Sequence, residues 1–171
     1  MKITQDDINH VPFFTIPNIN SKDKDIVRAI CQKVLYESMV NNDSKEVGLL
    51  LDSFDFNRHQ WFRGTENSVR FTVDWNKITD MDEYSNRYIA IHNHPDTNMF
   101  SMRDISSFIG NPFYYCMIMI YVDGSVHMLY KERTTNINDR VWFKNNFSSA
   151  SEFCKECDRC KMVYNYFRRL K

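Results

Sequence analysis

The most informative stretch of the chain, residues 89–104, reads Ile-Ala-Ile-His-Asn-His-Pro-Asp-Thr-Asn-Met-Phe-Ser-Met-Arg-Asp. An apolar run that is typical of a strand ends here in His92 and His94, and a proline then stops the strand. Alternate side chains of a strand share one face, so both histidines can reach one ion while Asn93 points away. Asp104 returns a carboxylate to the same place after a short loop.

Two imidazoles and one carboxylate form a ligand set that suits zinc and leaves a fourth position open for water, as in catalytic zinc sites. We therefore expect His92, His94 and Asp104 to bind one zinc ion per chain. A His-x-His pair alone is a weak signal, because ordinary exposed strands carry such pairs. The ordered series of strand, His-x-His-Pro, loop and Ser-x-x-Asp favours the metal. Non-haem iron sites use the same residue types, but this arrangement gives no positive reason to prefer iron.

The stretch from Ser101 to Asp104 also predicts the start of a helix. Serine is a good N-cap, and a carboxylate three residues later resembles a capping box. The pattern predicts a short helix over 104–109 that ends at Gly110. Both interpretations are compatible, since a residue in the first helical turn can cap the helix and still present its carboxylate to a metal.

These residues resemble a known signature. His92-Asn-His-Pro95 followed by Ser101-x-x-Asp104 is similar to the motif of the JAMM/MPN+ (JAB domain) zinc metalloproteases, above all their bacterial RadC-like and phage-associated members. The loop between His94 and Ser101 is one residue shorter than is usual there. Two further stretches match, Lys45-Glu-Val-Gly-Leu-Leu-Leu-Asp52 and Phe62-Arg-Gly-Thr-Glu-Asn-Ser-Val69. The matches span residues 46 to 130.

The resemblance implies a zinc-dependent hydrolase that cleaves a peptide or isopeptide bond with metal-activated water. It implies that Glu46, just before the first strand, is the general base, and that Ser101 donates to the oxyanion; Glu66 and Glu83 are weaker candidates for the base. The implied substrate is a protein or peptide, ubiquitin-like conjugates included. The implied fold is α/β, a single-domain mixed β-sheet flanked by helices, as in the MPN/cytidine-deaminase-like sandwich.

Two other functions stay open. One is a non-catalytic MPN-like module for protein interaction, and the other is a RadC-like protein associated with DNA repair. The chain has 22 basic and 22 acidic residues and no basic stripe interleaved with aromatic side chains. We therefore expect no nucleic-acid partner.

Composition indicates one globular domain. The chain has 171 residues, of which 43% are hydrophobic and 15% aromatic, enough for one buried core. The N-terminus lacks the apolar segment of a secretory signal, and the longest apolar run, 113–122, is too short to span a bilayer. Five cysteines, an odd number, fit a reducing compartment. We expect a cytoplasmic protein without membrane contact; the sequence carries no signal for an oligomeric state.

The pattern along the chain predicts three parts: an N-terminal arm over 1–20 in extended or strand form, the JAMM/MPN-like domain over 21–148, and a C-terminal helix over 149–171, with helical spacing from 152 to 170. Within the domain we expect a helix over 21–41 and a helix or loop over 75–84. Expected strands cover 46–54, 59–63, 67–73, 87–93, 113–122 and 125–131, with a hairpin turn at Asp123-Gly124.

Three cysteines near the C-terminus, Cys154, Cys157 and Cys160, could bind a soft metal, although such sites normally need four protein ligands. The alternative that we favour is an apolar helical stripe, which Cys157 and Cys160 form together with Phe153, Tyr164 and Phe167. His59 is expected to be a surface histidine and not a ligand.

Overall fold

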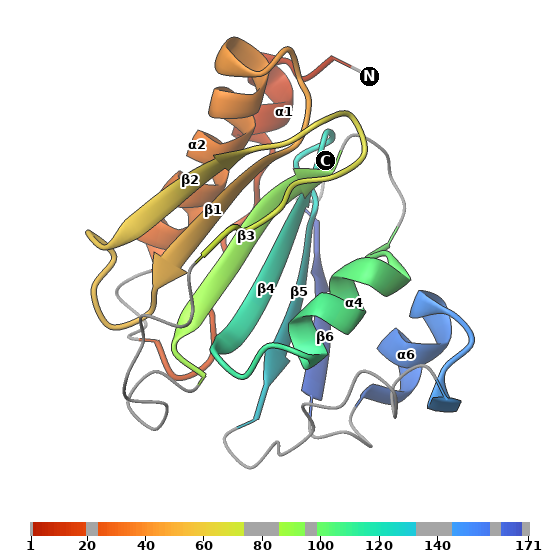
Figure 1. Ribbon diagram of the computed structural model, residues 1–171. Helices are drawn as coiled ribbons and strands as arrows, with labels where there is room; N and C mark the ends of the chain where they lie inside the picture. The colour runs from red at the N-terminus through yellow and green to blue at the C-terminus, as the bar shows by residue number, and fades with distance from the viewer. Residues whose placement is uncertain are drawn as a thin grey trace.

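The computed structural model describes residues 2–19, 24–73, 86–94, 99–132, 145–157 and 162–168. These residues form a six-stranded mixed sheet with helices on both faces (Figure 1). The predicted α/β class with one mixed sheet is therefore confirmed. In the described part of the chain, no helix is both long and apolar enough to cross a membrane.

The sheet has the strand order β2-β1-β3-β4-β5-β6. Strands β3 and β4 run parallel, and the other neighbouring pairs are antiparallel. The strands are β1 (Val47–Asp52), β2 (His59–Arg63), β3 (Tyr88–His94), β4 (Tyr114–Tyr121), β5 (Val126–Lys131) and β6 (Met162–Phe167), and the helices are α1 (Gln5–Asn9), α2 (Lys24–Asn41), α4 (Met102–Ile109) and α6 (Ala150–Glu156).

The parallel pair of strands positions the end of β3 and the start of α4. Parallel neighbours need a crossover connection, and α4 lies within the one that joins β3 to β4. Helices α4 and α6 cover one face of the sheet and α1 and α2 cover the other (Figure 1). The start of α4 consequently lies beside the C-terminal end of β3.

Two apolar clusters fill the space between the sheet and its helices. One joins the N-terminal residues and α2 to the sheet, and the other joins α4 and α6 to its opposite face. Strand β4 is buried along its whole length, as the continuous apolar run predicted for a central strand. The turn after β4 uses Gly124 at a φ of 78°, a left-handed conformation that glycine adopts without strain.

The prediction for the N-terminal arm is wrong in one element. Residues 5–9 form helix α1, which Thr4 caps through a reciprocal capping box with Asp7. The Thr-x-x-Asp spacing is the signal that the strand interpretation overlooked. The arm does pack on the domain, because its apolar side chains are buried in the α2 cluster.

The helix predicted over 149–171 is also wrong in its second half. Helix α6 ends at Glu156, and residues 162–167 form β6, which pairs antiparallel with β5. Val163 and the aromatic side chains of this segment favour a strand, and pairing with β5 satisfies their backbone groups. Tyr164 and Phe167 therefore belong to no helical stripe. Cys154 and Cys157 are buried in the α6 cluster, while Cys160 lies outside the described residues.

The strand predicted over 67–73 does not form, and these residues follow an irregular path. A Cβ atom at Gly48 would lie 3.0 Å from the ring of Phe71 and from the side chain of Val69. Because Gly48 has no side chain, Val69 and Phe71 can pack directly on β1. The segment predicted as helix or loop over 75–84 lies outside the described residues, as do Glu83 and Pro95.

Candidate active site

Three element ends converge where the strands end, on one side of the molecule: the start of β1, the end of β3 and the start of α4. Strand β1 pairs antiparallel with β3, with Gly48 opposite His92. Continuing this register by two residues sets Glu46 opposite His94. The topology thereby brings together the carboxylate and the two histidines that the sequence separates by more than forty residues.

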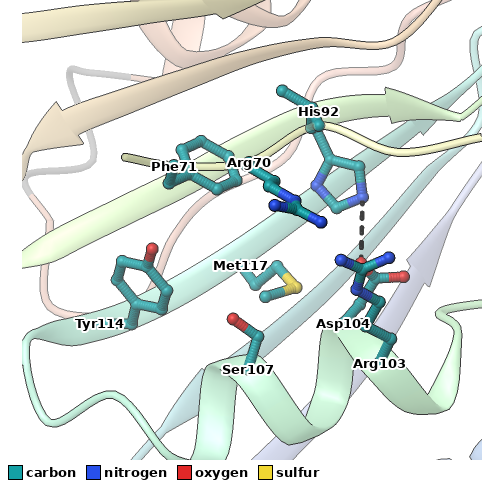
Figure 2. Close-up of a pocket in the computed structure, with 9 residues that line it drawn as sticks. Arg70, Phe71, His92, Arg103, Asp104, Ser107, Tyr114 and Met117 are labelled. Carbon is teal, nitrogen blue, oxygen red and sulfur yellow. Dashed lines mark ion pairs between the residues drawn. The ribbon is translucent and has the colours of Figure 1, made fainter. Parts of the chain in front are cut away.

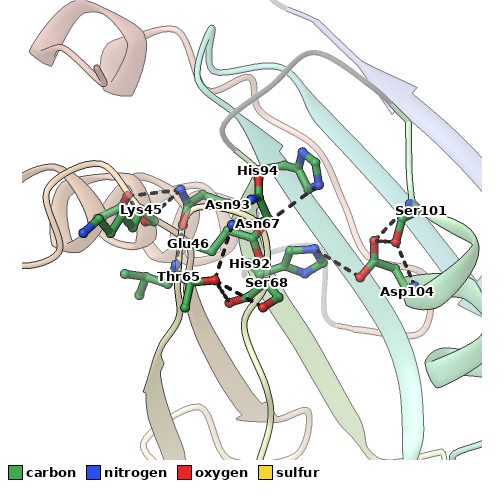
Figure 3. A network of polar contacts seen from close by, with 12 residues as sticks. Lys45, Glu46, Thr65, Asn67, Ser68, His92, Asn93, His94, Ser101 and Asp104 are labelled. Carbon is green, nitrogen blue, oxygen red and sulfur yellow. Dashed lines mark hydrogen bonds and ion pairs between the residues drawn. The ribbon is translucent and has the colours of Figure 1, made fainter. Parts of the chain in front are cut away.

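His92 and Asp104 face each other across the gap between β3 and α4. The Nε2 atom of His92 lies 3.9 Å from Oδ1 of Asp104. Figures 2 and 3 mark this contact with a dashed line. The other carboxylate oxygen, Oδ2, accepts from the backbone N of Ser101 at 2.9 Å and from its hydroxyl at 2.5 Å. The predicted capping box is confirmed, and it fixes the carboxylate with one oxygen directed at His92.

His92 is a buried imidazole with poorly satisfied nitrogens. Its side chain is 3% exposed, and Nδ1 has no hydrogen-bond partner among the described residues. Burial lowers the pKa of His92, Asp104 acts in the opposite direction, and His94 adds to the lowering. The ring is therefore neutral near pH 7, which is the form that binds a metal.

His94 faces Glu46 on the same side of the molecule. Its Nε2 atom lies 3.9 Å from Oε1 of Glu46, whose carboxylate is buried. The backbone N of Glu46 donates to the carbonyl of Thr65 at 2.9 Å, and its own carbonyl accepts from the backbone N of Gly64 at 2.8 Å. The stretch that resembles the family sequence Phe-Arg-Gly-Thr therefore holds the backbone of the candidate base.

Asn93 points to the opposite face of the sheet, as the alternation predicts, and is fully buried. Its amide oxygen accepts from the backbone N of Val47 at 2.7 Å. Its amide nitrogen donates to the Ser38 hydroxyl at 3.1 Å and to the carbonyl of Lys45 at 3.4 Å (Figure 3). One side chain thus ties β3 to α2 and to the residues on both sides of Glu46. The sequence gives no signal for this contact with α2.

The three predicted ligands are neighbours that do not form a closed set. Within the described ranges, no three His, Cys, Asp or Glu side chains are close enough to hold a metal ion. Two ligands that share a zinc ion lie about 3.4 Å apart for bonds of about 2.1 Å and a tetrahedral angle. The separation between His92 and Asp104 is longer by about 0.5 Å. The ring centroid of His94 lies 6.5 Å from that of His92. To bind the same ion, the His94 side chain would have to turn away from Glu46.

A cavity of about 230 Å³ lies beside His92 and Asp104 (Figure 2). One wall of the cavity is the segment over 69–71, which packs over Gly48, and the opposite wall is α4. The other lining residues were not predicted as site residues. They come from the segment after β2 (Val69, Arg70 and Phe71), from α4 (Arg103 and Ser107) and from β4 (Tyr114 and Met117).

The remaining candidates stand apart from this arrangement. Glu66 is exposed, and Glu83 lies outside the described residues. His59 is exposed on β2, where its ring contacts the carbonyl of Phe56 at 3.3 Å, so the prediction of a surface histidine is confirmed. The hydroxyl of Ser101 is engaged by the cap and donates to Asp104.

Comparison with known proteins finds no match: no family model, no curated protein and no solved structure matches this chain. The resemblance to the JAMM/MPN+ proteases therefore rests on the motifs quoted above.

Proposed function

We propose that this chain is a JAMM-type zinc hydrolase with an MPN-like sandwich fold, cleaving a peptide or isopeptide bond. The observation that carries the proposal is the state of His92. This buried imidazole has one nitrogen without a partner, and the other faces the single carboxylate oxygen of Asp104 that the capping box leaves available. The facing atoms, Nε2 of His92 and Oδ1 of Asp104, lie 3.9 Å apart, and an ion held between them would be bound by both.

The donor set fits zinc. His92, His94 and Asp104 supply two nitrogens and one oxygen, and three protein ligands leave a position for water. When bound, zinc supplies a Lewis acid that polarises the scissile carbonyl and makes the attacking water more acidic. The capping box contributes by holding Asp104 in place before any ligand arrives.

Glu46 is proposed as the general base. It is buried on the same side of the molecule, its backbone is held on both sides, and its carboxylate lies next to His94. In this role it takes a proton from the attacking water and gives it to the leaving amine, which requires hydrogen-bond distance to that water. Ser101 can donate to the oxyanion only by exchanging its present acceptor, Asp104, so orienting that carboxylate is the role that its geometry supports first.

Metal analysis tests the ligand set. Protein dialysed against zinc and then freed of excess metal should contain about one zinc per chain by mass spectrometry. His92→Ala and Asp104→Ala should lose it. His59→Ala removes an exposed histidine and should keep it. A wild-type protein without zinc, or a His92→Ala protein that keeps it, would contradict the proposal.

Hydrolysis of a panel of fluorogenic peptides and isopeptide-linked conjugates tests the mechanism. Glu46→Gln should retain zinc and lose roughly 100- to 10,000-fold in kcat, the usual contribution of general acid–base catalysis. Glu66→Gln is the matched control, because that side chain is exposed, and it should stay active. Full activity of Glu46→Gln removes Glu46 as the base, and zinc binding without cleavage of any substrate favours the interaction module.

A further inference from the structure

The cavity beside His92 and Asp104 is lined by two arginines that come from opposite walls. Arg70 belongs to the segment that crosses β1, and Arg103 belongs to the first turn of α4. Figure 2 shows both guanidinium groups reaching toward the space between the segment and the helix. Both side chains are largely exposed, so the cavity is open to a ligand from solvent.

The charges in this cavity are unbalanced. Arginine is always cationic in proteins, and none of the ion pairs between described residues involves Arg70 or Arg103. Asp104 is the one carboxylate among the described lining residues, and Ser101 and His92 already face its two oxygens. Among the residues that the structure describes, the site therefore presents two guanidinium forks without a carboxylate to pair with them.

A carboxylate is the group that this arrangement fits. The planar fork of arginine matches a carboxylate through two parallel hydrogen bonds, and the Ser107 hydroxyl lines the same space. A volume of about 230 Å³ is below the range of about 300–1,000 Å³ for pockets that hold drug-sized ligands. One acidic side chain or one chain terminus suits this volume, and a folded domain does not.

We propose that Arg70 and Arg103 bind a carboxylate of the substrate, so that the enzyme prefers amide bonds next to an acidic residue or a free C-terminus. This inference rests on the proposed function for its link to cleavage, because the cavity borders His92 and Asp104. The binding of the carboxylate itself requires neither a bound metal nor catalysis.

Direct binding tests the cavity separately from the hydrolase. The wild-type protein, kept free of metal by a chelator, is titrated by NMR with three matched probes. N-acetyl-glutamate α-amide carries only a side-chain carboxylate, N-acetyl-glutamine carries only a terminal one, and N-acetyl-glutamine α-amide carries neither. One charged probe should bind about 10- to 100-fold more tightly than the neutral probe, and the identity of that probe distinguishes the two sources.

The variant Arg70→Gln/Arg103→Gln should abolish that difference. Arg58→Gln is the matched control, because this arginine is exposed and lies outside the cavity, and it should keep the difference. Equal binding of all probes to the wild-type protein, or a difference that survives in the double variant, overturns the proposal.

Cleavage then links the cavity to the proposed function. With zinc present, the ratio of kcat/KM for acidic and neutral peptide substrates should fall toward one in the double variant. Arginine-dependent binding without cleavage of any substrate would refute the hydrolase and leave the carboxylate site in place. Cleavage with no preference for acidic substrates would refute the specificity and leave the hydrolase.

Discussion

Replacing Asn93 with alanine removes the buried amide that ties β3 to the start of β1. The variant leaves the backbone N–H of Val47 without its acceptor at 2.7 Å, in a region closed to solvent. An unpaired buried donor costs about 1–3 kcal/mol. The donated bonds to Ser38 and Lys45 add about 1 kcal/mol, since the Ser38 hydroxyl keeps its own bond to the Lys45 carbonyl. We expect a total loss of about 2–4 kcal/mol.

Urea unfolding followed by circular dichroism measures this loss as a lower midpoint with an unchanged slope. The matched control is Asn41→Ala, because Asn41 is exposed and bonds only locally to Glu37, and its effect should stay within about 0.5 kcal/mol. A loss for Asn93→Ala below about 1 kcal/mol, or one equal to the control, would refute the assignment of Asn93 as the tie between these elements.

Three further outcomes are expected. Asp52→Ala leaves the buried guanidinium of Arg87 without its carboxylate, now 2.7 Å away, and should cost about 3–5 kcal/mol in urea unfolding; a loss under 1 kcal/mol would contradict it. Burial lowers the pKa of Lys131 to about 7, so the wild-type protein loses stability as pH falls from about 10 to 7. The free energy of unfolding of Lys131→Met should therefore exceed that of the wild type by more at pH 6 than at pH 9.5. An equal difference at both pH values would argue against the lowered pKa of Lys131. Burial lowers the pKa of His127 to about 4, and its Nδ1 lies 2.5 Å from the hydroxyl of Tyr164. Its NMR titration should centre near pH 4, with stability lost between pH 6.5 and 4, whereas a midpoint near 6.5 would disprove the burial effect.

The sequence was sufficient for the parts of the site that local patterns encode. The alternation around Asn93 predicts which side chains share a face, and the Ser-x-x-Asp spacing predicts the cap that orients Asp104. Both are consequences of backbone geometry within a few residues, and both are confirmed. The continuous apolar run of β4 likewise predicts a strand buried on both faces.

Features that depend on long-range pairing could not be predicted. The register that sets Glu46 opposite His94 depends on how β1 pairs with β3, and the family resemblance alone suggested that these residues belong together. The spacing of the cysteines and aromatic residues predicts a helical stripe over the segment that forms β6. The structure differs because the backbone of β5 is free on one side to pair with this segment as a strand. The place of Arg70 in the cavity could not be predicted, because it depends on how the segment packs over Gly48, and no pattern in residues 67–73 reveals that packing.

The pairing of β6 with β5 has a practical meaning for anyone who shortens this protein. A product that ends after Glu156 would lack the strand that occupies one side of residues 126–131, leaving their amide and carbonyl groups available to another molecule. Exposed strand borders of this kind template self-association. Expression trials with C-terminal deletions should therefore yield insoluble material even though every residue at the candidate active site is retained.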